Sequence, residues 1–200
     1  IEFLTVTSKK FWAVLILFFV LGSIFAGGYF YLKQKNTRAF YDSASGLNFR
    51  ASKSWEELEG AEGMRYSPQA HIVIKKKERG RTVITIASEE FQGKKNFKVV
   101  ESIEVLDESL PAAIPTFTKI SSQEIDVCGP RGLQYDFSYK TGGINIMTGS
   151  TNPEVPMIQR KVYFLKNERM YYIDFAAEEE YFKEDVKDFE RILKSFSVDE

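Results

Sequence analysis

The chain has 200 residues and a mass of 23.0 kDa, with 44% hydrophobic and 28% charged residues, which fits one globular domain with an appendage and excludes collagen-like, mucin-like and disordered chains. One cysteine and one histidine exclude a disulfide scaffold, a cysteine-based zinc site and a histidine-rich metal centre. With a net charge of −1, the chain does not have the strongly positive surface that is typical of a nucleic-acid-binding protein. The charge is unevenly distributed: residues 1–40 are basic and the remainder is mildly acidic.

Residues 11–32 form the first predicted element, a transmembrane helix that follows an N-terminal tail of residues 1–10. The segment FWAVLILFFVLGSIFAGGYFYL has no charged residue. Its length of about 22 residues corresponds to roughly 33 Å of helix, enough for a hydrocarbon core of about 30 Å. Aromatic and lysine side chains flank the segment where a bilayer meets water. The predicted membrane-interface residues are Lys9, Lys10, Trp12, Tyr29, Tyr31 and Lys33.

This segment has two other interpretations, a cleaved signal peptide and a buried core helix. The apolar run continues past the weak cleavage motif at residues 26–28, and lysines flank both ends, so we expect a retained span. The flanking charges are nearly tied, and the simplest arrangement is an uncleaved signal anchor with the C-terminal domain outside the cytoplasm, in a periplasm, a lumen or at the cell surface. Small residues four positions apart predict a helix-packing surface. Its residues are Gly22, Ser23, Ala26 and Gly27.

A polar linker of residues 33–45 leads to a domain of residues 46–200. In the first part of this domain, apolar residues that alternate with polar ones predict a series of strands. These strands cover residues 46–50, 64–66, 71–75, 82–87, 116–120, 124–127 and 133–139. A helical stripe predicts a helix that begins at Asn96 and that Pro111 ends, because proline lacks a backbone donor.

The second part of the domain is predicted to contain a loop, a hairpin and a helix. The loop covers residues 142–156, and a tight turn joins strands at 161–165 and 169–176. Residues 178–194 form an amphipathic helix. Hairpin-linked strands with two helices predict an α+β class fold, an α/β/α sandwich whose mainly antiparallel sheet is flanked by helices and preceded by one transmembrane helix.

Three stretches of the domain carry a resemblance to a known family: SGLNFRASKSWEE, FTKISSQEIDVCGPRGLQYDFSY and KVYFLKNERMYYIDFAAEEEYFKEDVKDFERILKSFSV. Over most of residues 45–198 the chain resembles the PsbP-like family of extracytoplasmic domains, which includes the DcrB-type lipoproteins. Ser54 departs from the family pattern, which has a proline before the tryptophan. The resemblance implies a sandwich fold that acts through protein–protein contact, as a photosystem II extrinsic subunit or a bacterial envelope protein. It carries over no catalytic residue.

Few residues have a sequence context that favours chemistry. His71 begins a predicted strand, and Cys128 lies at a Gly-Pro turn with only His71 to activate it. Phosphate-binding and dinucleotide-binding motifs are absent from the sequence. Three consecutive glutamates at 178–180 point in different directions on a helix, which disfavours calcium. We therefore expect no catalytic residue, no cofactor and no metal.

Basic residues cluster on the hairpin between residues 71 and 87. The cluster is either a solvated edge that prevents aggregation or a docking patch for an acidic partner or anionic lipid headgroups. The residues of this patch are Lys75, Lys76, Lys77, Arg79 and Arg81.

The function predicted from these features is that of a non-enzymatic, single-pass, membrane-anchored interaction module. Such a module would be an accessory or assembly subunit of a larger membrane protein complex, for which family precedent offers a photosynthetic complex. The expected partners are subunits of that complex and the lipid bilayer, with a homo-oligomer as an option and no nucleic acid. The alternative is an envelope protein that binds a ligand or lipid in a cleft of the sandwich, and an enzyme ranks last.

Overall fold

The computed structural model describes residues 36–43, 45–66, 69–91, 97–144 and 151–199. The chain divides into two compact units, Ile1–Thr37 and Arg38–Glu200, and only the last two residues of the first unit are described. The predicted transmembrane helix, with its helix-packing and membrane-interface residues, lies outside the described residues. No helix within the described ranges is long and apolar enough to cross a membrane.

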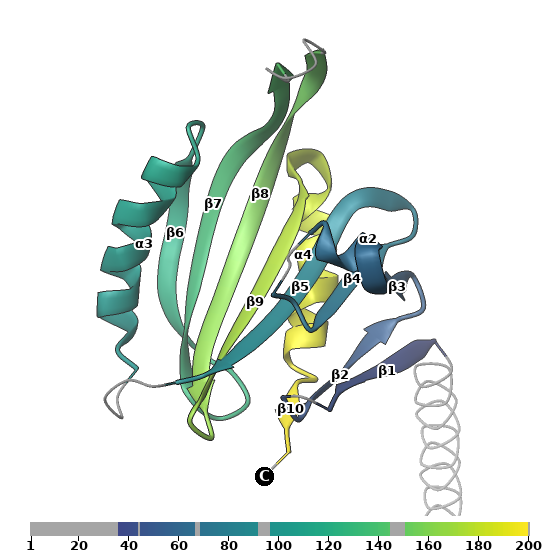
Figure 1. Cartoon of the computed structure of the whole chain (residues 1–200), viewed down its shortest axis with the longest axis vertical. Coiled ribbons are helices and arrows are strands. Elements are labelled where there is room, and N and C mark those ends of the chain that lie inside the picture. The colour runs from purple at the N-terminus through teal and green to yellow at the C-terminus, as the bar shows by residue number, and fades with distance from the viewer. Residues whose placement is uncertain (1–35, 44, 67–68, 92–96, 145–150, 200) are drawn as a thin grey trace, which may run out of the picture. The chain divides into compact units, whose positions relative to one another are not determined.

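Two antiparallel sheets account for the strands of the described residues (Figure 1). The larger one is built from β3 Trp55–Glu57, β4 Ile72–Lys76, β5 Arg79–Glu90, β6 Thr118–Asp126, β7 Arg131–Ile144, β8 Thr151–Lys166 and β9 Arg169–Glu178. Its strand order is β3-β4-β5-β9-β8-β7-β6. The smaller one is built from β1 Thr37–Asp42, β2 Leu47–Ser52 and β10 Ser197–Val198, in the order β1-β2-β10. The helices of the described residues are α2 Gly60–Met64, α3 Val99–Ala113 and α4 Glu179–Leu193.

The large sheet has two faces that are covered differently, because successive side chains of a strand point to opposite sides. On the first, the α4 face, α4 and the small sheet enclose the main apolar core, which includes Phe49, Ile84, Phe164, Ile173 and Phe175. On the second, the α3 face, α3 packs on β7 and β6, and α2 lies over β4 beside Val73. Figure 1 shows α4 behind the sheet and α2 in front of it. The fold is thus an α+β sandwich, as the sequence predicts.

The closing hairpin and helix show how local sequence produces this architecture. The turn between β8 and β9 places Asn167 and Glu168 at φ 51° and 58°, the conformation of a two-residue type I′ turn that matches the twist of the paired strands. The apolar stripe of α4 then lies on the sheet, with Phe189 stacked on Phe175 at a ring-centroid distance of 4.9 Å. These elements confirm the predicted strand at 169–176 and helix at 178–194 within two residues.

Two of the predicted boundaries on the N-terminal side are wrong. The stretch predicted as a linker contains β1. The Phe40 ring of β1 stacks on the Phe49 ring at a centroid distance of 5.0 Å, and because Phe40 is buried, the segment is part of the fold. The strand predicted at 64–66 is instead the end of α2 and a turn. Short apolar runs do not distinguish a strand from a helical turn by periodicity alone.

Two further predicted boundaries, the end of the helix at Pro111 and the loop at 142–156, differ from the observed ones. In both cases proline lies within a helix or strand. Pro111 lies within the last turn of α3, and the helix closes when the Ile114 N–H donates to the Leu110 carbonyl at 2.9 Å. Much of the loop predicted at 142–156 belongs to β7 and β8. Pro153 and Pro156 lie in the part of β8 that precedes its pairing with β9, which begins at Met157, so this part has β7 as its neighbour among the described strands. Proline is tolerated in strands that are unpaired on one side.

Gly132, near the start of β7, provides a test of packing between β7 and its neighbour β8. A Cβ atom there would lie 2.7 Å from the Tyr163 carbonyl oxygen and 3.1 Å from the Phe164 Cβ. We expect Gly132→Ala to lower the free energy of unfolding by about 1–3 kcal/mol, measured by urea denaturation, because backbone atoms must move. Gly80→Ala is the matched control, since nothing lies within 4 Å of its Cβ position, and it should change stability by less than about 1 kcal/mol. Equal effects of the two substitutions would contradict this packing argument.

Candidate functional site

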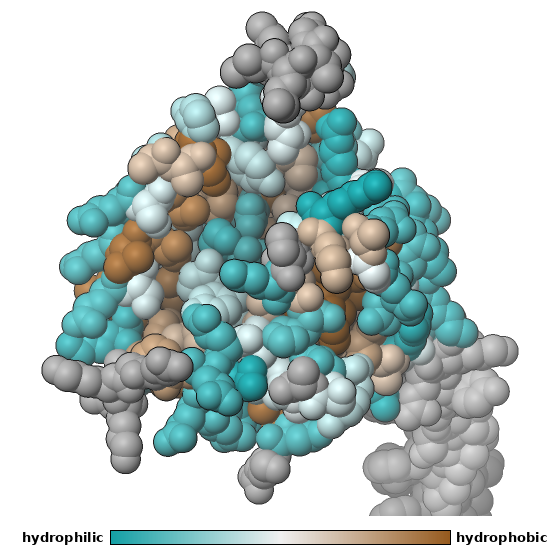
Figure 2. Space-filling model, viewed as in Figure 1, coloured by the Kyte–Doolittle hydropathy of each residue, from teal (hydrophilic) through white to brown (hydrophobic). Residues whose placement is uncertain are grey.

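The centre of the α3 face contains a hollow of about 340 Å³. It lies over β5, β9 and β8, in the part of the face that neither α2 nor α3 covers. Figure 2 shows mainly hydrophilic side chains here, with more hydrophobic areas on both sides. The residues that line the hollow are Gln69, Thr85, Ala87, Glu89, Tyr163, Tyr172 and Asp174.

Strand register and side-chain size create this hollow. Ala87 on β5 pairs with Tyr172 on β9, which pairs with Tyr163 on β8, and the next row contains Thr85 and Asp174. The two tyrosine rings meet edge to face at a centroid distance of 4.9 Å. Because the Ala87 and Thr85 side chains are much smaller than the tyrosines beside them, the protein surface is lower over β5 than over β9 and β8.

A carboxylate at the floor of the hollow is only half satisfied. Lys161 Nζ donates to Asp174 Oδ2 at 2.7 Å across the β8–β9 pair. The other oxygen, Asp174 Oδ1, is buried and has no hydrogen-bond partner among the described residues. A buried acceptor without a partner is unfavourable by about 1–3 kcal/mol. Oδ1 would gain a hydrogen bond if the carboxylate, whose side chain is 26% exposed, turned this oxygen toward a donor in the hollow.

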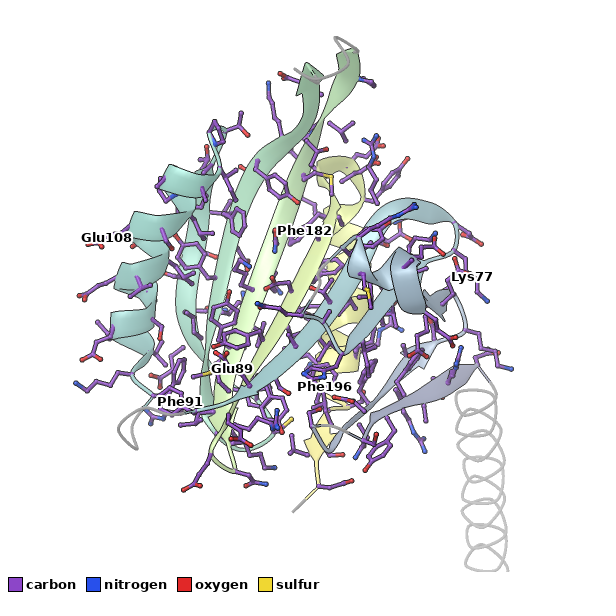
Figure 3. The ribbon with its side chains drawn as sticks, in the orientation of Figure 1. Lys77, Glu89, Phe91, Glu108, Phe182 and Phe196 are labelled. Atoms are coloured by element: carbon purple, nitrogen blue, oxygen red, sulfur yellow. The ribbon has the colours of Figure 1, made fainter. Side chains whose placement is uncertain are left out.

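The tyrosine hydroxyls remain protonated in this environment. Burial, together with a hydrogen bond donated to Glu89 Oε1 at 2.5 Å, raises the pKa of Tyr172 far above its usual value. Burial and the nearby negative charge of Asp174 raise the pKa of Tyr163 in the same way. The charge of Asp174 is offset by Lys161, whereas Glu89 adds negative charge to the hollow. Figure 3 labels Glu89 near one end of β5.

The predicted basic patch is largely paired within the domain. Lys75 lies 3.6 Å from Glu56, and Arg81 lies 3.7 Å from Glu178. Lys76 Nζ donates to Asp185 and Asp188 of α4, and Arg79 donates to Glu184 and Asp185. Figure 3 shows Lys77 at the exposed tip. Lys76 and Arg79 thus attach the hairpin to α4 and do not form a free positive surface.

The structure brings together a serine, a histidine and an aspartate that sequence reasoning missed. His71 Nε2 lies 3.3 Å from Ser88 Oγ, and His71 Nδ1 lies 3.7 Å from Asp42 Oδ2. The residues come from β5, the segment before β4, and β1, so only the pairing of distant strands reveals them. No motif connects them along the sequence.

The contacts of these three residues do not match those of a nucleophile and its base. His71 Nε2 is closer to the Ser88 carbonyl oxygen, at 3.0 Å, and a carbonyl can only accept a hydrogen bond. Nε2 therefore carries the proton and cannot take one from the Ser88 hydroxyl. Arg169 also donates to Ser88 Oγ at 3.0 Å. We interpret the group as a contact that joins β1, β4 and β5.

Cys128 has the features of a structural thiol. Its Sγ donates to the Phe196 carbonyl at 3.1 Å, and burial raises the pKa of the thiol, which disfavours the reactive thiolate. The described residues contain no group of three or more histidine, cysteine, aspartate or glutamate side chains arranged to hold a metal ion.

Comparison with known proteins identifies the fold and leaves the family open. No protein-family profile and no curated protein sequence matches the chain. Solved structures do match. The cyanobacterial PsbP (CyanoP) from Synechocystis sp. PCC 6803 is 12% identical with a TM-score of 0.57, over 82% of this chain and 93% of that one. The Ran-binding protein Mog1p of Saccharomyces cerevisiae is 9% identical with a TM-score of 0.51, over 82% and 95% respectively. The chain therefore has a PsbP/Mog1-like fold.

Proposed function

We propose that this protein is a non-catalytic recognition module, held at a membrane by residues 11–32, that contacts a partner protein through the hollow of its α3 face. The observation that supports the proposal is the hollow itself, with its unpaired buried Asp174 oxygen beside two tyrosine rings. A recognition surface needs such partly desolvated polar and aromatic groups, because aromatic residues dominate binding energy at interfaces. The module would be an accessory subunit of a larger membrane protein complex.

The proposal places the domain outside the cytoplasm, and its support here comes from sequence. The uncharged segment 11–32 and its flanking lysines favour a signal anchor. The fold shared with a cyanobacterial PsbP agrees with an accessory role and makes a photosynthetic complex one candidate setting. Recovery of the intact chain in the aqueous fraction, without detergent, would overturn the anchored arrangement.

The alternative function, binding of a small ligand or lipid, has one observation in its favour. The volume of about 340 Å³ falls within the range of about 300–1,000 Å³ typical of small-molecule sites. The lining argues against a lipid chain, because Ala87 is the only aliphatic residue among the described residues that line the hollow. A protein partner remains the stronger proposal.

Site-specific photocrosslinking tests the proposed docking face. Benzoylphenylalanine at Gln69, an exposed residue of the hollow, is expected to give one discrete adduct in the membranes of the source cells. The control position is Glu108 on α3, which points away from the sheet (Figure 3). Ala87→Leu in the Gln69-labelled chain should abolish the adduct, because the larger side chain fills the hollow. An adduct that persists in Ala87→Leu, or that forms equally from position 108, would contradict the proposal.

A fluorophosphonate probe, applied to the same membrane preparations, tests whether Ser88 is a reactive serine. We expect no labelling of the full chain, because His71 is oriented toward a carbonyl oxygen and not toward the Ser88 hydroxyl. Labelling that Ser88→Ala removes would establish a serine hydrolase in place of a recognition module.

A further inference from the structure

The chemistry of the hollow restricts what its occupant can be. Of the seven described residues that line it, two are carboxylates and none is basic. Lys161, beside the hollow, donates to Asp174 Oδ2 at 2.7 Å, and its Nζ lies over the Tyr163 ring, 5.8 Å from the ring centre. An anionic group would therefore meet Asp174 and Glu89 without a free positive partner. A group that donates hydrogen bonds and carries positive charge is complementary to this surface.

The aromatic floor favours the same type of group. Ring faces carry negative potential, and a cation over a tyrosine gains about 0.5–1 kcal/mol at exposed sites and about 2 kcal/mol when desolvated. Tyr172 is held by its hydrogen bond to Glu89, and Tyr163 by its edge-to-face contact with Tyr172. Both rings are therefore fixed before a ligand arrives, which reduces the entropy lost on binding.

The shape of the hollow selects among cations. Thr85 and Glu89 are four residues apart on β5, about 13 Å along a strand, so the hollow is elongated. A guanidinium is planar, weakly hydrated and able to stack on an aromatic ring while its edge donates to a carboxylate, whereas an ammonium is a compact and strongly hydrated charge. Arginine is also the basic residue enriched at protein interfaces.

We infer that the hollow binds an arginine side chain of the partner protein, with the guanidinium stacked on the Tyr163–Tyr172 pair and donating to the Asp174 carboxylate, which lines the hollow. This inference rests on the proposed function, since it names the group with which the partner occupies the docking face. Glu89 lies toward the other end of the hollow and contributes negative charge there.

Titration of the full chain in mild detergent with short peptides tests this inference. The probe is the peptide Ac-Gly-Gly-Arg-Gly-Gly-amide, and the matched peptide contains citrulline, which has nearly the same shape without the charge. We expect saturable shifts of the Thr85, Ala87 and Asp174 amide signals in ¹H–¹⁵N spectra. The citrulline peptide should bind at least tenfold more weakly.

Variants separate the role of each group. Asp174→Asn should weaken binding of the arginine peptide about tenfold or more, and Tyr172→Leu should weaken it about fivefold. Tyr172→Phe retains the ring and should stay within about threefold of the unmodified chain. Glu90→Gln, a charge change on the exposed neighbour of Glu89, is the control and should change nothing. Ala87→Leu is a second, independent variant for the case that Asp174→Asn perturbs folding. It removes no polar group and fills the hollow, so it should abolish binding of the arginine peptide.

The outcomes distinguish failure of this inference from failure of the proposed function. Equal affinity for the arginine and citrulline peptides, or unchanged affinity in both Asp174→Asn and Ala87→Leu, would overturn the inference. If position 69 still crosslinks a partner in that case, the docking face stands and only the arginine is wrong. Loss of the crosslink as well would overturn both.

Discussion

Replacement of Asp185 by alanine is expected to lower the free energy of unfolding by about 3–5 kcal/mol, the usual cost of breaking a buried ion-pair network. The Asp185 side chain is 0% exposed and lies on α4 against the β4–β5 hairpin. It accepts hydrogen bonds from Lys76 at 2.5 Å, Arg79 at 2.6 Å and Thr82 at 2.9 Å. Its loss leaves Lys76, whose side chain is only 10% exposed, with Asp188 as its remaining acidic partner.

The same network supplies controls for this measurement by urea denaturation. Glu184→Gln removes an exposed partner of Arg79, since the Glu184 side chain is 71% exposed, and should cost no more than about 1 kcal/mol. The double variant Lys76→Met/Asp185→Leu should recover part of the stability lost in Asp185→Ala, because no buried charge is left unpaired. A cost below 1 kcal/mol for Asp185→Ala would show that the network does not hold α4 to the hairpin.

The pH dependence of stability follows from the same groups. Burial alone would raise the pKa of Asp185, but the hydrogen bonds from Lys76, Arg79 and Thr82 outweigh it and leave the pKa below its usual value of 3.8. The carboxylate therefore contributes its full stability above about pH 4 and loses it as the pH falls through the folded-state pKa. Burial lowers the pKa of Lys76, but Asp185 and Asp188 raise it further, to a net value above 10.5. Its contribution is complete below that pH and disappears as the pH rises through the folded-state pKa. Asp185→Asn should flatten the acid limb of the stability profile.

The elements that could be predicted from sequence are those specified by neighbouring residues. Alternation in residues 169–176 identifies β9, because one face of the strand packs in the core and the other lies in the hollow. The apolar stripe of 178–194 likewise identifies α4. The α+β sandwich follows from such local patterns, since each hairpin and amphipathic helix must bury one side.

The pairing of the basic hairpin could not be predicted from local sequence. Residues 75–81 read as a positively charged surface because their partners are far away along the chain. Lys76 and Asp185 are 109 residues apart, and Arg79 and Glu184 are 105 apart. The acidic residues of α4 appear in the sequence as an ordinary solvent-exposed helix face. Only the packing of α4 beside the hairpin makes them partners.

The hollow is hidden in sequence for a related reason. Glu89, Tyr163 and Asp174 belong to three strands, and their proximity depends on the register in which β5, β9 and β8 pair. A partial signal exists in β9, where Tyr172 and Asp174 are polar or amphipathic residues on a face that α2 and α3 leave uncovered. The sequence alone does not indicate that the small residues Thr85 and Ala87 lie beside them.

Phe189→Ala is expected to cost about 3–5 kcal/mol, the range for loss of a fully buried phenylalanine. Phe189 is 0% exposed, and its ring lies nearly parallel to that of Phe175, with an interplanar angle of 11°. Loss of the ring leaves a cavity between α4 and β9 that the surrounding strands, held in register on both sides, cannot close. Phe182→Ala is the matched control on the same helix. The Phe182 ring also contacts the Phe175 ring, at a centroid distance of 5.5 Å, but Phe182 is only half-buried, so its replacement should cost clearly less stability. Equal costs in urea denaturation would contradict the assignment of Phe189 as the main α4 contact.

The position of Phe189 also separates stability from recognition. Phe189 packs on the α4 face, whereas Tyr163, Tyr172 and Asp174 point to the opposite face of the same strands. Phe189→Ala should therefore weaken the fold without changing the affinity of the folded protein for the arginine peptide, whereas Asp174→Asn should lower that affinity. A loss of peptide affinity in Phe189→Ala, measured where the chain is still folded, would mean that the hollow depends on packing across the sheet and that its side chains are not preorganised by the α3 face alone.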